Sequence, residues 1–592
     1  MSSSATPPQL RSAGRVFAIV LGALLVLAVA MLVWVGIRGY MAYNHLQSAQ
    51  QTAAGAADKL SDPSEAPTLI DDLSADTSAA HALTSDPIWS IVQTLPWIGP
   101  QLNAVSTVAA AADQVGSTAL APLGDVAATF SVDSLKPVDG HIDISVFTSI
   151  QDAAATSATA SAQAAASVQS LDRSALLGPV ADAIDEVGDT LDAIAETTTA
   201  IQKVSVLLPA MLGQDGARDY LIVFQNNAEW RSLGGIVGAM AVVHTDGGSM
   251  SLTTQDSSSS FREYASPVLP LSDDILQVFG ERPGKWIQNV TQIPDFEESG
   301  PLAQAMWSQQ HGQTVDGVIS VDPVALSYVL AATGPVTLPT GDVLTSDNAV
   351  QLMLNEVYLR YPKSADQDAF FAEATAAVFD KLSSGDVDPA KLVTALAKAG
   401  EEDRLLIWSD HAEDQAELEG TTLAGGLPAS DAQSAGFGVY LNDGTGSKMD
   451  YYLDASTTLD WDQCTTLATG QAAGAATLSV TVTSNAPADA ATLPSYITGG
   501  GSFGVPAGTA RTLVYVYLPE SFTLAGADRS DGGGFGGGTH EGRRVVSFQV
   551  DLTPGQSMTA TITASTDASA PTLTVSQTPG VTSVDTPVTT CG

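Results

Sequence analysis

Basic residues are scarce in this chain, which carries 23 Lys and Arg against 65 Asp and Glu over 592 residues. The formal net charge is -42. A surface of that sign repels the phosphates of DNA and RNA, which a binding protein must neutralise with cations. Nucleic acid is therefore excluded as a partner. Hydrophobic residues make up 44% of the chain, too many for a disordered acidic tail, so we expect the acidic side chains to coat several folded domains.

Cysteine and histidine are also rare. The only cysteines are Cys464 and Cys591, both in the last quarter of the chain. In an exported domain such a pair predicts a disulfide, which would contribute about 5 kcal/mol in the loop-entropy model. The seven histidines are dispersed, and none is spaced to share a zinc ion with either thiol. A metal centre built from Cys and His is therefore disfavoured.

Charge is absent from one long segment, Val16–Ile37. At about 1.5 Å per residue its 22 residues span roughly 33 Å, which is enough to cross the hydrocarbon core of a membrane. No cleavage motif of a signal peptide follows it, so we expect an uncleaved anchor. Arg11 and Arg15 precede the segment and Arg38 follows it, which favours a cytoplasmic tail at 1–15 and an extracytoplasmic bulk.

The segment from residue 40 to 209 is rich in Ala, Ser and Thr and predicts a helical region near the membrane. Its clearest helix has an apolar seam at spacings of 4, 3, 4, 3 and 7 residues, typical of a helical bundle. The seam residues are Val180, Ile184, Val187, Leu191, Ile194 and Ile201. Trp89 and Trp97 lie among apolar residues with two proline breaks. Core packing is favoured for them over contact with the membrane interface.

Two further domains follow, each with its own periodicity. From 217 to 400, apolar runs at Tyr220–Phe224, Ile236–Val243 and Val315–Val321 predict strands, and a helix is expected from Pro323 to Ala332 after an Asp322 cap, which indicates an α/β domain. From 437 to 592, short alternating segments separated by Pro, Gly and Asn predict a β-sandwich. A Gly-x-Ser-x-Gly string at 500–504 lies in this all-β region, which does not suit a nucleophile elbow.

The polar residues between the first two strands of the α/β domain are the best candidates for a binding site. We expect a turn at Asn226, Asn227, Glu229 and Arg231, followed by Gly234 and Gly235, which would let backbone amides approach a ligand closely. Arg262 follows the third expected strand. Two converging guanidinium groups suit phosphate or pyrophosphate. The plainer alternative is that Arg231 pairs with Glu229 or Asp219 and fixes the turn.

Several segments resemble an exported bacterial family known as domain of unknown function four thousand and twelve. They are "YLIVFQNNAEWRSLGGIVGAM", "NVTQIPDF", "VDGVISVDPVALSYVLAATGPV" and the upstream "DPIWSIVQTLPWIGP". The resemblance implies a membrane-anchored envelope protein of the actinobacterial type, from high-GC Gram-positive bacteria, and no settled activity.

The α/β region also resembles, more distantly, the LytR-CpsA-Psr phosphotransferases, which transfer glycopolymers from a polyprenyl-pyrophosphate carrier to peptidoglycan. "DYLIVFQNN" is similar to their opening strand, Arg231 falls where their first arginine follows it, and Arg262 and Arg360 fall near two later ones. The resemblance implies that these arginines hold pyrophosphate. The acidic residue that follows the first arginine in that family is missing here, and Asp368-Ala369 replace an arginine-glutamine pair. Binding without transfer is therefore an open alternative.

Together these features predict a single-pass envelope protein that binds a lipid-pyrophosphate-linked or phosphorylated glycan and, if it is an enzyme, transfers glycopolymer to the cell wall. Arg231, Arg262 and Arg360 would clamp the pyrophosphate. Glu229 or Asp295 would hold a divalent cation such as Mg2+ or act as a base. The alternatives are a non-enzymatic scaffold or adhesion protein, and a module whose assembly depends on divalent cations.

Overall fold

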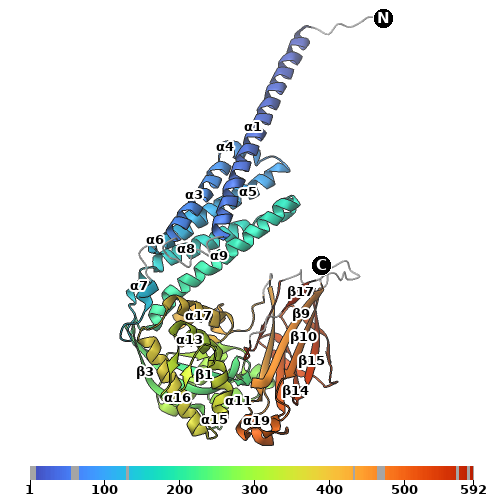
Figure 1. Ribbon diagram of the computed structural model, residues 1–592. Helices are drawn as coiled ribbons and strands as arrows, with labels where there is room; N and C mark the ends of the chain where they lie inside the picture. The colour runs from blue at the N-terminus through green and yellow to red at the C-terminus, as the bar shows by residue number, and fades with distance from the viewer. Residues whose placement is uncertain are drawn as a thin grey trace. The chain divides into compact units, whose positions relative to one another are not determined.

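The computed structural model describes residues 8–54, 66–127, 132–430, 434–462, 474–567, 572–582 and 587–590. Backbone contacts divide the chain into two compact units (Figure 1). The first comprises Met1–Ser134 and Ile144–Pro209, and the second comprises Leu135–Asp143 and Ala210–Gly592.

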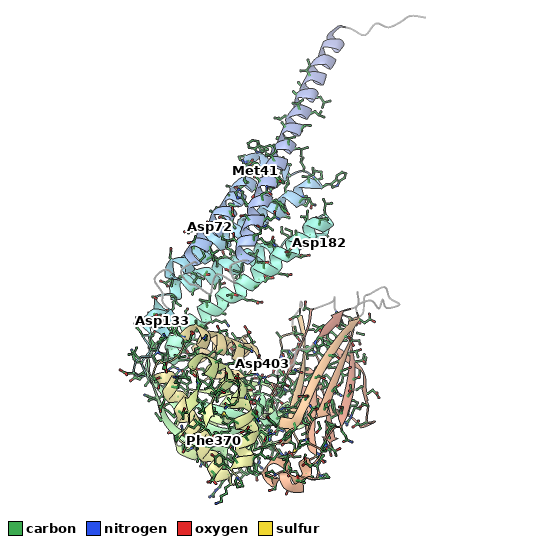
Figure 2. All side chains as sticks on the ribbon, viewed as in Figure 1. Met41, Asp72, Asp133, Asp182, Phe370 and Asp403 are labelled. Atoms are coloured by element: carbon green, nitrogen blue, oxygen red, sulfur yellow. The ribbon has the colours of Figure 1, made fainter. Side chains whose placement is uncertain are left out.

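The first unit is helical, as the sequence predicts. Its main helices are α1 (Pro8–Ala54), α3 (Ala66–Thr84), α4 (Pro87–Val92), α5 (Ile98–Gln114), α6 (Ala121–Ala127), α7 (Ser145–Thr148), α8 (Gln151–Gln169) and α9 (Gly178–Met211), with a π-helix at Val115–Leu120. Ala42, Ala80 and Ala109 are fully buried against one another, so α1, α3 and α5 approach closely. Ile184 and Leu191 of the apolar seam lie in a second buried cluster. Acidic residues such as Asp72 and Asp182 are exposed (Figure 2).

Helix α1 contains the segment expected to cross the membrane. Within it, Ile19–Ala53 is long and apolar enough for a membrane span, with a mean hydropathy of 2.8 in its most apolar stretch. Its position near the N-terminus is compatible with a single-pass anchor.

The second unit begins with a five-stranded sheet in the order β3-β2-β1-β4-β7. Its strands are β1 (Arg218–Arg231), β2 (Gly234–Asp246), β3 (Ser249–Ser257), β4 (Gly317–Val321) and β7 (Leu405–Ser409). Strands β1 and β4 are parallel, and the other neighbours are antiparallel. Side chains alternate between the two faces of β1, so Leu221 and Val223 enter one buried cluster while Ile222 and Phe224 face the opposite side.

Helices cover both faces of this sheet. The face of Leu221 and Val223 packs against α10 (Asp273–Val278), the 3-10 helix at Ile287–Gln292 and α12 (Phe296–His311). The face of Ile222 and Phe224 lies opposite α13 (Pro323–Thr333), α16 (Ser364–Ser383) and α17 (Pro389–Glu401). Asp322 caps α13 by accepting from Ala325 N at 2.7 Å. The α/β expectation is confirmed by this three-layer arrangement.

The expected turn from Asn226 to Arg231 is wrong, because β1 continues to Arg231 and the turn is Ser232-Leu233. The register explains the error. Asn226 is opposite Ile236 and Trp230 is opposite Gly235, so residues 227–229 form a bulge in the strand. Bulges redirect side chains, and this one carries both Asn227 and Glu229.

The C-terminal part is a sandwich of two five-stranded sheets, ordered β12-β15-β10-β9-β17 and β13-β14-β11-β8-β16. The strands are β8 (Ser434–Asp443), β9 (Leu453–Asp462), β10 (Gly474–Ser484), β11 (Ala510–Tyr517), β12 (Thr523–Arg529), β13 (Gly536–His540), β14 (Arg543–Leu552), β15 (Ser557–Thr566), β16 (Thr572–Gln577) and β17 (Val588–Thr590). Strand β10 alternates as predicted, with Leu478, Val480 and Val482 fully buried.

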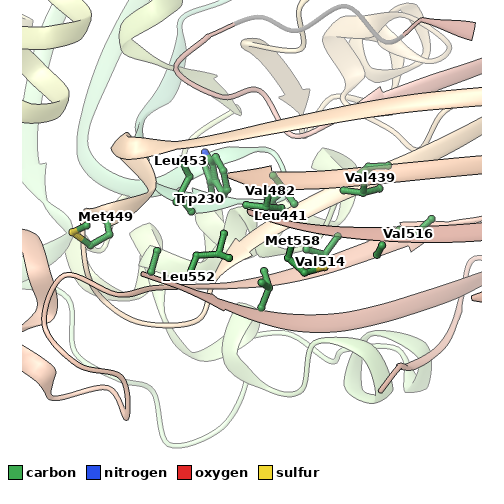
Figure 3. Packing of buried hydrophobic residues seen from close by; sticks show 14 of the residues in the cluster. Trp230, Val439, Leu441, Met449, Leu453, Val482, Val514, Val516, Leu552 and Met558 are labelled. Carbon is green, nitrogen blue, oxygen red and sulfur yellow. The ribbon is translucent and has the colours of Figure 1, made fainter. Parts of the chain in front are cut away.

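The sandwich core also contains a residue of the α/β sheet. Trp230 of β1 is 2% exposed and packs beside Leu453 and Val482 (Figure 3). The two β-rich parts therefore share one hydrophobic cluster. Cys464 and Cys591 lie outside the described residues, and their disulfide stays a prediction. Strand β17 pairs in parallel with β9, with Thr590 opposite Trp461.

Candidate functional site

The side chains of the α/β domain leave a cavity of about 580 Å³ between the sheet and helices α13, α16 and α17. Its wall is largely apolar. Ile222, Phe224, Ala239, Ala241, Val243 and Leu252 line it from the sheet, and Leu326, Val329, Phe371, Val378, Phe379, Leu382 and Leu396 line it from the helices. Several of these side chains are only half-buried, although they lie between two layers of secondary structure. The volume falls in the range of small-molecule sites in proteins.

Polar groups line one end of the cavity. Gln225 and Asn226 follow the apolar run of β1, and Asp322 follows β4. Ser257 ends β3, and Ser258 and Ser259 come directly after it. Since β1 and β4 are parallel, these residues meet at the carboxyl ends of the strands, where open α/β sheets usually bind ligands. Ser257 and Ser259 both donate to the carboxylate of Asp368, at 2.8 and 3.0 Å.

Two cations lie close in sequence to residues that line this polar end. Arg262 lies three positions after Ser259, so their Cα atoms are at most about 11 Å apart. Lys363 immediately precedes Ser364, a lining residue at the start of the 20-residue helix α16. Both cationic side chains belong to exposed residues. Arg360 follows the lining residue Tyr358 and pairs with Glu356 and, at 2.7 Å, with Asp342. We call Ser257–Ser259, Arg262, Lys363, Ser364 and Asp368 the polar rim.

A buried ion pair closes part of the same end. Glu229 on the β1 bulge pairs with Lys448, and both side chains are less than a tenth exposed. The ammonium group lies 4.6 Å from the ring centre of Tyr358 and 4.7 Å from that of Tyr496, which suits cation–π attraction. Burial alone would lower the pKa of Lys448, but Glu229 and the two tyrosines outweigh it and raise that pKa overall. Lys448 therefore remains protonated, and Glu229 neutralises its positive charge inside the protein.

Arg231 lies on the sandwich side of the hairpin and does not line the cavity. It is 6% exposed. Its Nε and Nη2 donate to Asn289 Oδ1 at 3.1 and 2.9 Å, and its Nη1 donates to Trp230 O at 2.7 Å. Next to it, Ser232 N donates to Asn442 Oδ1 at 3.1 Å. These bonds join the hairpin to the 3-10 helix after α11 (Arg282–Lys285) and to β8 of the sandwich.

Two buried carboxyl groups accompany Arg231. Burial is the main cause that raises the pKa of Asp443 and of Asp450 above the ordinary range, and the charge of Arg231 opposes it in both. Asp450 accepts a hydrogen bond from Trp230 N at 2.8 Å. One oxygen of each carboxyl, Asp443 Oδ2 and Asp450 Oδ1, has no hydrogen-bond partner among the described residues. Burial therefore favours the protonated form of both carboxyls, and the hydrogen bond from Trp230 N ties Asp450 to the hairpin.

Asn227, Gly234 and Gly235, which were also expected at the site, have structural roles within the protein. Asn227 Nδ2 donates to Asp322 Oδ2 and to Pro579 O, each at 3.0 Å. Gly235 N donates to Gln225 Oε1 at 2.6 Å, and a Cβ at Gly235 would come within 2.3 Å of the Asn226 backbone. Gly234 has a φ of 128°, which favours glycine. Both glycines therefore serve the tight hairpin.

Asp295 caps α12 through Glu297 N at 2.8 Å and does not line the cavity. Burial and the nearby Glu541 raise its pKa to about 7. In the described part of the chain no three His, Cys, Asp or Glu side chains gather as metal ligands. Sequence reasoning missed Lys448 and the role of Asp368, and it assigned Lys363 no role in the site. The Ser-rich segment before Arg262 was the signal that could have indicated the rim.

Lys448→Met should lower the free energy of unfolding by about 3–5 kcal/mol, because Glu229 would remain buried without its partner. The double variant Lys448→Met/Glu229→Met should recover most of that loss, since no unpaired charge remains. Chemical denaturation checks both values. The matched control is Lys381→Met, whose partner Asp386 is exposed, and it should change stability by less than about 1 kcal/mol. Equal losses in the single and double variants would contradict the buried pair.

Asp450→Asn should stabilise the protein increasingly as the pH rises. In the folded state the pKa of Asp450 lies well above its ordinary value of 3.8, so the folded protein holds a proton that the unfolded chain releases. The stability from this protonated group is complete below about pH 4 and is lost as the pH rises through the folded pKa. Asparagine removes that loss. Unfolding curves at pH 5 and pH 8 measure the difference in stability between wild type and Asp450→Asn. The control is Asp460→Asn, because Asp460 is exposed. A difference that stays constant with pH would refute the buried proton.

Comparison with known proteins adds a match for the part of the chain that carries the β1–β2 hairpin and some of the cavity wall. No curated protein matches the chain. Residues 215–358, which include β1, β2 and the bulge, match the model of a family described as "Protein of unknown function (DUF4012)".

Proposed function

We propose that this protein is an envelope protein whose α/β domain binds a lipid-linked, phosphorylated glycan carrier. The apolar chain of the carrier occupies the cavity, and its phosphate groups lie at the polar rim. The observation that carries the proposal is the cavity itself, about 580 Å³ of space with a largely apolar wall and one polar end. Space of this kind costs stability, because the lining atoms lose packing contacts, so it requires a functional reason.

The distribution of charge supports the position of the head group. Arg262 and Lys363 are exposed cations at the rim, and Ser364 begins a long helix whose first turn favours anions. The resemblance to phosphotransferases that use polyprenyl pyrophosphate agrees with an isoprenoid chain as the apolar part. Arg360 borders the same end, where Glu356 and Asp342 already neutralise it.

Arg231 and Glu229 are both engaged inside the protein, which leaves the rim as the place for any chemistry. There, Asp368 is the carboxylate that could share Mg2+ with the phosphate oxygens of a carrier, since Mg2+ is commonly bound through one or two carboxylates and substrate phosphates. In a transfer at Asp368, Arg262 and Lys363, a hydroxyl of the cell wall would attack the phosphorus that bears the glycan and lose its proton to water. The P–O–P bond would break, and polyprenyl phosphate would leave.

The location proposed for this activity is the outer face of the membrane. Helix α1 is suited to anchor the chain, and the basic residues Arg11 and Arg15 on its N-terminal side favour a cytoplasmic N-terminus. A carrier lipid in the same membrane would be a local ligand for a protein anchored beside it.

A non-enzymatic scaffold is the second candidate. The observation that favours it is the network at the β1–β2 hairpin, where Arg231 bonds to Asn289 and Ser232 bonds to Asn442 of the sandwich. A scaffold would not require the cavity, so a cavity variant separates the two functions.

Val329→Phe should weaken binding of a short-chain polyprenyl pyrophosphate by tenfold or more, at least about 1.4 kcal/mol. Val329 is a half-buried lining residue of α13, and the added ring would occupy the space needed by the chain. The measurement is a titration of the full-length protein in nanodiscs with Mg2+ present. Val393→Phe is the matched control, because Val393 is 54% exposed on α17 and does not line the cavity.

The head group is tested in the same titration with the corresponding prenyl alcohol. The double variant Arg262→Ala/Lys363→Ala should weaken binding of the pyrophosphate and leave binding of the alcohol unchanged. A folded wild-type protein that binds neither ligand would overturn the proposal and favour the scaffold.

A further inference from the structure

Side-chain contacts within the first unit show how its helices lie along α1. Helix α3 runs antiparallel to α1, because His45 contacts Asp76 at 2.8 Å while Arg38, earlier in α1, donates to Leu83 O at 2.9 Å. Arg38 also donates to Ala82 O and pairs with Asp86 at 3.0 Å. Helix α3 therefore runs toward the membrane-spanning part of α1 and ends at the level of Arg38, the first charge after the apolar span.

Helix α4 continues past that level. Trp89 and Val92 are buried against Val35 of α1, and Met31 packs against the same cluster. Met31 and Val35 belong to the apolar span and precede Arg38, so they lie on the membrane side of that charge. Trp89 is anchored in turn by its indole N–H, which donates to Leu102 O at 3.2 Å. The hairpin of α4 and α5 thus reaches beyond the polar boundary of the unit.

The end of this hairpin exposes large apolar side chains. Ile91, Leu95 and Ile98 are between 43% and 56% exposed, and Trp97 is 89% exposed. The turn holds Trp97 outward with a φ of 71°, an uncommon conformation for a residue other than glycine. Gly99 makes the turn possible, since a Cβ there would lie 2.1 Å from Gln93 O.

A second hairpin end lies beside the first. Gln101 of α5 donates to Ala175 O at 2.9 Å and accepts from Leu177 N at 3.1 Å. Leu177, in the connection between α8 and α9, is 65% exposed. We call Ile91, Leu95, Trp97, Ile98 and Leu177 the apolar tip.

Charge is absent from the α4–α5 hairpin in a chain that is otherwise strongly acidic. None of residues 87–112 is charged. An exposed tryptophan with leucine and isoleucine around it is unusual for a surface in water, whereas amphipathic aromatic rings are typical of the membrane–water interface. The α4–α5 hairpin that carries most of the tip packs against Met31 and Val35 of α1 through Trp89 and Val92.

We propose that the apolar tip inserts into the membrane interface beside α1, so that a lipid surface is its partner. The first unit then has two attachments to the bilayer, the span of α1 and the tip, and these fix its tilt and height above the membrane. This inference rests on the membrane helix and is independent of the carrier-binding cavity, which lies in the other unit.

The test uses the full-length chain in nanodiscs and compares its tryptophan fluorescence with that of Trp97→Phe. The difference between the two spectra isolates Trp97. Phospholipids brominated near the head group should quench this difference at least twofold, and aqueous acrylamide should quench it little. Trp307→Phe is the control, because Trp307 is fully buried and its difference spectrum should respond to neither quencher.

Two results would overturn the proposal. Quenching of Trp97 by acrylamide and not by brominated lipid would place the tip in water. Protection from both quenchers would mean that protein covers the tip, either a second copy of the chain or another partner. Trp97→Phe changes an exposed side chain for another aromatic one, so the variant is expected to fold.

Discussion

The alternation of side chains along strand β1 is the constraint on which the second unit depends. Leu221 and Val223 point into a filled core, while Ile222 and Phe224 point into the cavity. The same strand then bulges and ends with Trp230 in the core of the sandwich. One strand therefore supplies the stable face, the wall of the candidate site and the attachment of the next domain.

The bulge has an energetic consequence. It places Glu229 in a buried environment, where an unpaired carboxylate would cost several kcal/mol, and Lys448 of the sandwich side neutralises it. Arg231 and the carboxyls of Asp443 and Asp450 form a second buried polar group at the same junction. Burying a polar group without a partner is costly, so the pairs Glu229–Lys448 and Ser232–Asn442 favour this arrangement of sheet and sandwich.

Much of the fold could be predicted from local patterns, and much of the site could not. Three features depend only on neighbours in sequence, so local patterns are enough to predict them. They are the uncharged run at Val16–Ile37, the seam with Ile184 and Leu191, and the alternation in β10. The turn expected at Asn226 failed because a bulge looks like a turn in sequence. The pair of Glu229 and Lys448 joins residues 219 positions apart, and no local pattern encodes it. The cavity exists because the side chains between the sheet and the helices do not fill the space between these layers. Composition alone does not reveal such unfilled space.

The central claim is that the cavity holds the apolar chain of a carrier lipid. Native mass spectrometry of the full-length wild-type protein, extracted from its own membrane and released from detergent in the instrument, tests it most directly. The account predicts a bound species that, once released, gives the mass of a phosphorylated polyisoprenoid, with chain lengths that differ by isoprene units. Protein that carries no lipid, or only the bulk phospholipids of the membrane in their bulk proportions, would contradict it.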